Sequence, residues 1–227
     1  MNKIKDFLLE LLFPCFCLGC QKEGTYLCQD CKATLNISEL NYPINNSKNL
    51  SGLCFALPYK ENILTKKLIH QFKYPPYTKG LAKTLALLLA EHLFLSGNNK
   101  EEIWQNSVLV PIPLDKNKLK NRGYNQSKEL AKELSKIIKV PMVSDVLIKI
   151  KSTKPQIKLS KSERETNLQN AFSIKNCRTS GVLQFVGKKV FLIDDVYTTG
   201  STMNECAKVL KQAGAKQVWG IAIAREQ

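Results

Sequence analysis

Residues 190–202 read VFLIDDVYTTGST, an apolar run that ends in two carboxylates and continues into hydroxyl residues around one glycine. Four consecutive apolar residues, two of them β-branched, are typical of a strand that is buried on both faces of a sheet. The pattern predicts that this strand stops at a polar sheet edge, where Asp194 and Asp195 follow it.

A helix and a second strand are predicted directly after this stretch. Apolar residues recur at helical spacing from Met203 to Ala213, and Gly214 suits the end of a helix. The apolar run at residues 218–223 then predicts another strand. Together these segments form a strand-turn-helix-strand unit of ordinary βαβ size.

The turn between the predicted strand and helix has the atoms of a phosphate site. Free N–H groups at a helix start, the small Gly200 and the neighbouring hydroxyls predict a nest for a phosphate monoester. Carboxylates at its rim can accept hydrogen bonds from two sugar hydroxyls, or help to hold Mg²⁺ through water. Phosphate and diol recognition side by side describe a ribose 5-phosphate ligand.

Residues 193–202 resemble the phosphoribosyl pyrophosphate (PRPP) motif of type I phosphoribosyltransferases. This resemblance implies that the two acids face the ribose hydroxyls and that the following loop wraps the 5-phosphate. The PRPP-binding residues implied in this way are Asp194, Asp195, Val196, Tyr197, Thr198, Thr199, Gly200, Ser201 and Thr202.

Three other kinds of protein share parts of this pattern. P-loop ATPases need an upstream glycine-rich loop that ends in Gly-Lys-Ser/Thr. Residues 181–189 do not match this loop, because one residue too many separates their glycines and Lys189 stands where Ser or Thr belongs. They also precede the strand, whereas a P-loop follows one. Receiver domains also have a pair of acids, but their phosphate-accepting Asp lies on a later strand. The residues between this acid pair and Gln227 are too few to form the rest of such a domain. A plain N-cap turn needs one Ser or Thr and no cluster.

Composition indicates a globular chain with an anionic partner. Its 227 residues, 44% of them hydrophobic, can bury one core and carry a small appendage. The net charge is +15, and residues 111–161 contribute +9 of it with 13 Lys/Arg against 4 Asp/Glu. A polyphosphate substrate and nucleic acid would both satisfy this charge, and a lysine-rich proteome would explain part of it.

The first residues predict neither a membrane span nor a secretory signal. The apolar run at residues 7–13 is short, is broken by Glu10, and lacks small residues of a cleavage site after it. We therefore expect a cytoplasmic protein whose eight cysteines are reduced. That compartment favours a metal over disulfides for clustered cysteines.

Two Cys-x-x-Cys knuckles, separated by seven residues, predict a structural zinc site. The four ligands are Cys17, Cys20, Cys28 and Cys31. The loop between the knuckles is shorter than in most zinc ribbons, and Cys15 is a spare that could replace Cys17. A thioredoxin-like redox site would need one such pair at a helix start. We interpret the remaining cysteines as packing residues: Cys54, Cys177 and Cys206.

The middle of the chain predicts alternating strands and helices. Residues 36–51 form a polar linker, and strands are expected at 53–59 and 107–113. Helices are expected at 63–72, 81–95 and about 127–139.

A basic loop is predicted from Leu114 to Gln126, at the end of the second of these strands. Open α/β sheets bind ligands at such positions, and Arg122 can contact two pyrophosphate oxygens at once. A solvated lysine loop is the alternative.

The long polar segment from Lys149 to Phe172 is either a lid over the site or a disordered loop. As a lid it would bring Lys154 and Arg164 to the pyrophosphate together with Arg122. Both histidines, His70 and His92, are interpreted as structural.

Motifs along nearly the whole chain resemble the ComF (ComFC) family of competence proteins. They are the two knuckles, Lys73-Tyr74, residues 110–113 (VPIP), residues 122–126 (RGYNQ), Gln156, Leu159-Ser160, Glu163-Arg164, Asn167, Ala171-Phe172 and the PRPP motif. The family implies a zinc ribbon joined to a phosphoribosyltransferase domain, linked to natural transformation and the handling of incoming single-stranded DNA. One departure is Lys149, where the family tends to have Arg, which puts a two-pronged contact there in doubt.

We therefore predict an α/β protein with a Rossmann-like, mostly parallel sheet of the type I phosphoribosyltransferase class. Residues 1–36 would form a zinc ribbon with a short N-terminal helix, residues 37–52 a linker, and residues 53–227 the phosphoribosyltransferase domain.

Two functional hypotheses follow. One is an enzyme that displaces pyrophosphate from ribose C1 of PRPP with Mg²⁺, using Asp194, Asp195 and Arg122 as catalytic residues. No residue is recognisable as a general base, so the acceptor is open. The other is a PRPP-binding module that grips single-stranded DNA and works with competence-machinery proteins.

Overall fold

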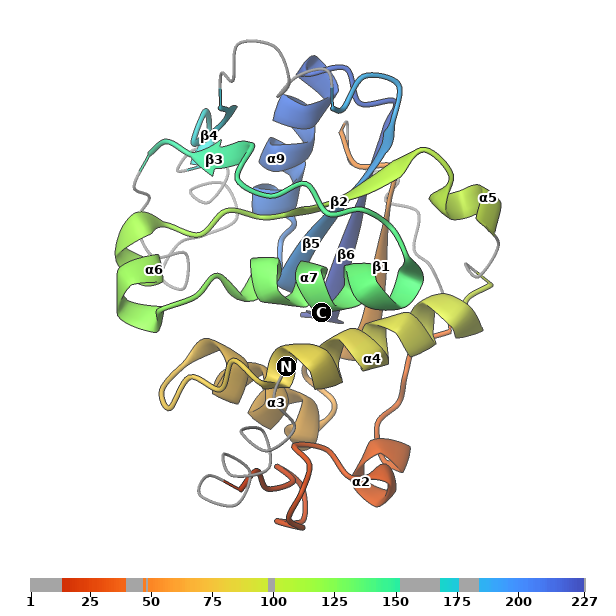
Figure 1. The fold of residues 1–227 in the computed structure, drawn as a ribbon, viewed down its shortest axis with the longest axis vertical. Helices are drawn as coiled ribbons and strands as arrows, with labels where there is room; N and C mark the ends of the chain where they lie inside the picture. The colour runs from red at the N-terminus through yellow and green to blue at the C-terminus, as the bar shows by residue number, and fades with distance from the viewer. Residues whose placement is uncertain are drawn as a thin grey trace, which may run out of the picture.

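A four-stranded parallel sheet forms the centre of the molecule (Figure 1). The computed structural model describes residues 14–39, 47, 49–97, 101–151, 168–175 and 184–226. Within these ranges the sheet has the order β1-β6-β5-β2. Its strands are β1 (Gly52–Pro58), β2 (Ser107–Pro111), β5 (Lys189–Tyr197) and β6 (Gln217–Arg225).

Helices cover both faces of this sheet (Figure 1). One face packs against α3 (Ile63–Lys73), α4 (Leu81–Leu95) and α7 (Gln126–Ile138). The other packs against α9 (Ser201–Gln212) and a two-stranded antiparallel ribbon of β3 (Leu147–Lys149) and β4 (Phe172–Ile174). Three short helices complete the described elements: α2 (Gln29–Ala33), α5 (Glu101–Trp104) and α6 (Lys116–Arg122).

The predicted strand-turn-helix-strand unit is confirmed as β5, α9 and β6. Phe191 and Ile193 enter the core beneath α4 and α7, while Val190 and Leu192 enter the core beneath α9. This alternation explains the uninterrupted apolar run, because each side chain of the strand is buried on one face or the other. The predicted α/β class with a mostly parallel sheet is therefore also confirmed.

The strand does not stop at the acids, and this part of the prediction is wrong. β5 continues through Asp194 and Asp195 to Tyr197, because β6 runs beside it and pairs Asp194 with Ala222 and Val196 with Ala224. The alternation therefore continues into the acids. Asp195 leaves the strand on the α3 and α7 face, and Asp194 leaves it on the α9 face.

The predicted basic loop contains a helix, so its description as a loop is also wrong. Asp115 caps α6 by accepting hydrogen bonds from the N–H groups of Asn117 and Lys118 at 3.0 and 3.4 Å. Gly123, at a φ of 79°, ends it in the left-handed conformation that glycine adopts without strain. A cap and a stop were both present in the sequence.

The other predicted elements of the central part are confirmed within a few residues as β1, β2, α3, α4 and α7. Several predictions fall outside the described residues: the N-terminal helix, Cys177, and most of the polar segment with Lys154 and Arg164. Among the residues that are described, no helix is long and apolar enough to cross a membrane.

The N-terminal cysteine segment packs directly on the helices. Leu18, Tyr26 and Leu27 contact the core that contains α3 and α4. Further along, the N–H of Ser38 donates to the carbonyl of Ala56 in β1. The division into a ribbon, a linker and a main domain stays a prediction.

Candidate functional site

A cavity of about 390 Å³ lies at the carboxyl ends of β5 and β2. Its walls come from the end of α3, the loop after β2, the starts of α6, α7 and α9, and the ribbon β3–β4. Parallel sheets bind ligands at this edge, where loops and helix starts converge. Both acids of the predicted motif line the cavity.

Asp195 is the more enclosed of the two acids, with only 3% of its side chain exposed. Its Oδ1 lies 2.9 Å from Nζ of Lys73, and its Oδ2 accepts a hydrogen bond from Nε2 of Gln126 at 2.9 Å. Burial opposes ionisation here, but the Lys73 charge and these two hydrogen bonds outweigh it and lower the pKa of Asp195. This lowered pKa keeps Asp195 ionised at neutral pH.

Asp194 has a different electrostatic environment. Its Oδ1 accepts hydrogen bonds from Oγ of Ser127 at 3.0 Å and from the N–H of Asp195 at 2.9 Å. Burial, followed by repulsion from Asp195, raises the pKa of Asp194 to about 7. Adjacent acids with separated pKa values give a site that can hold one proton near neutral pH.

The hydroxyl turn lies beside the acids at the start of α9. Gly200 has a φ of 77°, and a Cβ on it would lie 2.2 Å from Oη of Tyr197. Only glycine therefore allows the Tyr197 ring to pack against the turn. Thr198, Gly200 and Thr202 line the cavity, whereas Thr199 and Ser201 bond each other through their hydroxyls at 2.9 Å.

Val196 and Tyr197, the remaining members of the predicted PRPP-binding set, also line the cavity. The structure thus brings together the acids and most of the turn. It leaves Thr199 and Ser201 off the cavity wall.

Arg122 does not line the cavity. In the described part of the chain, its Nε and one terminal nitrogen, Nη1, are buried without a hydrogen-bond partner. Its charge nevertheless contributes to lowering the pKa of Asp195, after the contributions of Lys73 and Gln126. Lys154 and Arg164, the other predicted pyrophosphate contacts, lie outside the described residues.

Three cavity residues whose side chains contact the acid pair were not predicted as site residues: Lys73, Gln126 and Ser127. Lys73 ends α3, and the other two begin α7. The first two belong to short motifs that the ComF resemblance had singled out. The spacing of these residues in the sequence does not show that they contact the acids, because the packing of α3 and α7 on the sheet brings them together.

A second cationic wall comes from the opposite face of the sheet. Lys118 and Lys149 both line the cavity, and Nζ of Lys149 lies 5.9 Å from the centre of the Phe172 ring. Burial, followed by the weaker repulsion of Lys118, lowers the pKa of Lys149. The cavity thus has lysines on both sides of the acid pair.

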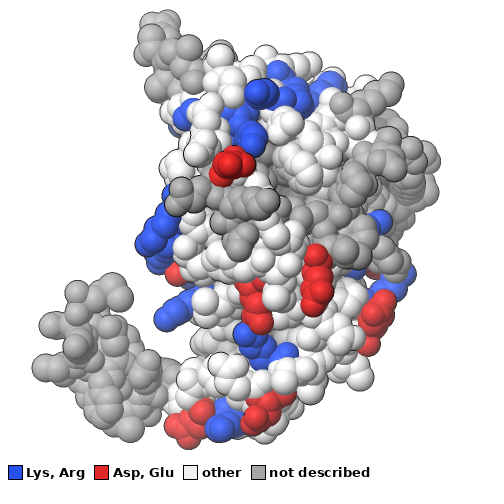
Figure 2. Space-filling model, turned by 90° about the vertical axis from the view of Figure 1, so that its right-hand side faces the viewer, with Lys and Arg blue, Asp and Glu red and all other residues white. Residues whose placement is uncertain are grey.

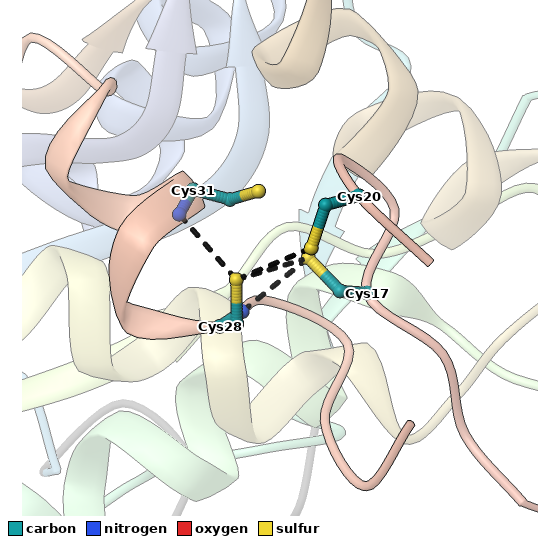
Figure 3. Close-up of side chains that lie close together, drawn as sticks. All are labelled: Cys17, Cys20, Cys28 and Cys31. Atoms are coloured by element: carbon teal, nitrogen blue, oxygen red, sulfur yellow. Dashed lines mark hydrogen bonds between the residues drawn. The ribbon is translucent and has the colours of Figure 1, made fainter. Parts of the chain in front are cut away.

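The four predicted metal ligands converge in the N-terminal segment (Figure 3). The Sγ atoms of Cys17, Cys20, Cys28 and Cys31 all lie within 4.8 Å of one another. The Cys17 and Cys20 sulfurs lie 3.7 and 3.5 Å from that of Cys28. Tetrahedral coordination with Zn–S bonds of about 2.3 Å requires sulfurs about 3.8 Å apart, so the residues fit such an ion.

Backbone N–H groups point at two of these sulfurs. The N–H of Cys28 donates to Sγ of Cys17, and the N–H of Cys31 donates to Sγ of Cys28, both at 3.4 Å. Burial opposes the thiolate of Cys17, but surrounding N–H groups outweigh it and lower the pKa to about 6. Four sulfurs would leave no open position on a bound ion, which fits a structural site, and Cys15 is not among the four.

Comparisons with known proteins show the family to which this chain belongs. Residues 119–225 match the phosphoribosyl transferase domain family. Competence protein F of Haemophilus influenzae is 35% identical over 162 residues, which cover 69% of this chain and 67% of that protein. Competence protein ComFC of Streptococcus pneumoniae is 28% identical over 221 residues, 90% of each chain. DNA utilization protein YhgH of Escherichia coli K12 is 32% identical over 154 residues, 67% of this chain and 64% of that protein.

Solved structures with similar chains include two PRPP proteins. Glutamine PRPP amidotransferase from B. subtilis has a TM-score of 0.36 at 22% identity and covers 63% of this chain and 25% of its own. Phosphoribosylpyrophosphate synthetase from Mycobacterium smegmatis has a TM-score of 0.35 at 16% identity and covers 67% of this chain and 51% of its own.

Proposed function

Because the chain belongs to the ComF family of competence proteins and carries a phosphoribosyl transferase domain, we propose that it binds PRPP and takes part in handling single-stranded DNA during uptake. The observation that carries this proposal is the cavity in which an acid pair, a lysine and a hydroxyl turn meet. Each has a counterpart in PRPP, which carries a ribose diol, a 5-phosphate and a pyrophosphate on C1.

In this proposal PRPP binds in one orientation, with its 5-phosphate on the α9 side of the sheet and its pyrophosphate on the α3 side. The 5-phosphate binds the turn at Gly200, where N–H groups begin α9. The ribose hydroxyls donate to Asp194 and Asp195. The pyrophosphate then extends toward Lys73, on the α3 side. Mg²⁺ would neutralise part of the pyrophosphate charge beside these carboxylates.

Pentosyl transfer is a second candidate function of the same cavity. A nucleophile would form a bond to ribose C1 while the bond from C1 to the pyrophosphate oxygen breaks. Lys73 is the described cation best placed to stabilise the departing pyrophosphate, because it already lies beside Asp195. Arg122 would join it only by turning toward the cavity. The acceptor is unassigned.

DNA handling is supported by the charge on α6. Lys116, Lys118 and Lys120 are exposed on this helix, and Lys118 also lines the cavity. The face of the molecule shown in Figure 2 has a different distribution of charge from α6, because its Lys and Arg side chains are interspersed with Asp and Glu. A strand along α6 would place its phosphates on lysines and a nucleotide near the cavity mouth.

The cysteine cluster, in this proposal, holds zinc, and the protein works in the cytoplasm, where thiols stay reduced. Competence-machinery proteins are the partners that a DNA-uptake role implies.

Isothermal titration with PRPP and Mg²⁺ tests the proposal directly. We expect saturable binding by the wild type, and loss of that heat in an Asp194→Asn, Asp195→Asn double variant. Lys136→Met is a suitable control, because Lys136 is exposed and pairs with Glu133 on α7. A folded wild-type protein that releases no heat with PRPP would refute it. Release of pyrophosphate across a panel of bases and nucleotides then separates binding from transfer.

A further inference from the structure

Helix α3 connects the cysteine cluster to the acid pair. It begins at Ile63 beside the cysteine segment and ends at Lys73 in the cavity. Its 11 residues span about 16 Å at the rise of an α-helix. Whatever holds its first turn therefore influences where its last residue lies.

A chain of hydrogen bonds joins the cluster to the first turn of α3. Oγ1 of Thr34, the residue that caps α2, donates to the carbonyl of Cys31 at 2.8 Å. The carbonyl of Thr34 accepts a hydrogen bond from Nδ2 of Asn62 at 3.1 Å. Oδ1 of Asn62 accepts from the N–H of Leu64 at 2.8 Å, which caps α3. One amide side chain therefore binds the cysteine segment with its nitrogen and starts α3 with its oxygen.

Packing reinforces this connection. Gly19 lies inside the first knuckle, and a Cβ there would lie 2.5 Å from Sγ of Cys31 and 3.5 Å from Cδ2 of Leu64. The space is therefore shared between a metal ligand and a buried residue of the first turn of α3. Because interiors are close-packed, a shift of the knuckle changes the position of Leu64.

A second contact reaches the connection that follows α3. The Tyr26 ring, between the two knuckles, lies against Gly80 so closely that a Cβ on Gly80 would be 3.0 Å from it. Gly80 precedes α4, and Thr78 beside it accepts a hydrogen bond from Nε2 of Gln71 in α3 at 3.1 Å. The cysteine segment thus contacts both the start of α3 and the connection that follows it.

The far end of α3 lies at the acid pair. The carbonyl of Phe72 accepts a hydrogen bond from Oη of Tyr124 at 2.6 Å. The next residue, Lys73, makes the ion pair with Asp195. Since Lys73 is only 28% exposed, few alternative positions are open to it while α3 stays in place.

We infer that the metal-filled cysteine cluster positions Lys73 against Asp195 through α3, with Asn62 as the positioning residue that joins the two sites. Without the metal, the knuckles lose the bonds that hold Thr34 against Asn62 and Gly19 against Leu64, the contacts that fix the first turn of α3. Lys73 then pairs less often with Asp195, and the pyrophosphate of PRPP loses a preorganised cation. This inference rests on the proposed binding of PRPP.

An Asn62→Asp variant isolates the connection. Aspartate still caps α3, because its oxygen accepts from the same N–H groups, but it cannot donate to the carbonyl of Thr34. We expect the zinc-loaded variant to keep its zinc and to bind PRPP about five- to tenfold more weakly, as coupled contacts do. Asn106→Asp is the matched control, since Asn106 also donates to a carbonyl, that of Gly187, at the opposite edge of the sheet.

A double-mutant cycle with Lys73→Met separates positioning from general weakening. If Asn62 acts through Lys73, Asn62→Asp weakens PRPP binding in the wild-type background and leaves the affinity of Lys73→Met unchanged. Removal of zinc with a chelator should likewise weaken PRPP binding by the wild type and leave the affinity of Lys73→Met unchanged. Equal losses in both backgrounds would overturn the inference.

Hydrogen exchange gives a readout that does not need PRPP. Removal of zinc from the full chain should speed exchange at the amides of the last turn of α3 more than at those of α9. Unchanged exchange at α3 would overturn the inference even if PRPP binds. Faster exchange together with no PRPP binding by the zinc-loaded wild type would support the connection and refute the proposed function instead.

Discussion

Nζ of Lys73 lies 2.9 Å from Oδ1 of Asp195, although the two residues are 122 positions apart in sequence. The lysine ends a helix on one face of the sheet, and the acid lies near the end of a central strand. A cation held beside a carboxylate keeps that carboxylate ionised, and it is also close to where a pyrophosphate would bind.

Replacement of Lys73 by methionine should affect both binding and stability. Asp195 would stay buried without its charge partner, which costs about 1–3 kcal/mol of unfolding free energy. PRPP affinity should fall about tenfold or more, because a charge-assisted hydrogen bond to the ligand is lost. Urea unfolding and titration calorimetry measure the two effects. A stability loss with unchanged PRPP affinity would remove Lys73 from the pyrophosphate site.

The raised pKa of Asp194, about 7, predicts how PRPP binding depends on pH. Ribose hydroxyls donate better to a carboxylate than to a carboxylic acid, so the affinity should rise as the pH increases from about 6 to 8. The Asp194→Asn variant should lose this dependence. Because the ligand's own phosphates also titrate in this range, the difference between the two profiles is the quantity to measure.

The same residue makes a prediction for stability. Its pKa is higher in the folded than in the unfolded protein, so the folded state binds the extra proton between about pH 4 and 7. The contribution of Asp194 to stability is complete below this window and is lost as the pH rises through about 7. Asp194→Asn should therefore show a smaller decline of unfolding free energy over this window than the wild type.

Gly200→Ala tests the phosphate turn. The substitution brings a methyl group against Tyr197 at a φ of 77°, so it should cost more than the about 1–2 kcal/mol of the backbone strain alone and weaken PRPP binding strongly. Gly187→Ala is the control, because Gly187 has a φ of 70° but no neighbour within 4 Å of an added Cβ. It should show only the backbone cost, with normal PRPP affinity. Equal behaviour of the two variants would argue against the turn as the phosphate site.

Cysteine variants should distinguish the metal ligands from their neighbour. Cys20→Ser removes one of the four clustered sulfurs and should release zinc and lower the melting temperature. Cys15→Ser should retain one zinc per chain, since Cys15 is outside the cluster. Metal analysis of both proteins with thermal melts checks this, and zinc loss from Cys15→Ser would exchange the roles of Cys15 and Cys17.

The role of α6 predicts a salt-dependent effect on DNA. In a Lys116→Met, Lys120→Met double variant, the slope of log affinity against log salt should fall by about 1.4 for single-stranded oligonucleotides. PRPP affinity should stay normal, because neither lysine lines the cavity. An unchanged slope would place the DNA elsewhere on the protein.

The sequence predicted those parts of the molecule that depend on local pattern. The apolar run before Asp194, the spacing of α4 and the paired knuckles each contain their own structural signal. The helix α6 was missed even though Asp115 and Gly123 are a recognisable cap and stop, because the lysines between them suggested a loop. Sequence spacing could not show that Lys73 and Gln126 meet Asp195, since only the packing of α3 and α7 on the sheet brings them there.

The alternation of β5 has a consequence for how this site can change over evolutionary time. Asp195 lies on the face of Ile193, and Asp194 lies on the face of Leu192, because two positions along the strand separate each acid from that apolar residue. A single-residue insertion or deletion before them would move each acid to the other face of the sheet, away from its present partners, which are Lys73 for Asp195 and Ser127 for Asp194. The spacing between the apolar run and the acids is therefore expected to tolerate substitutions but no change in length.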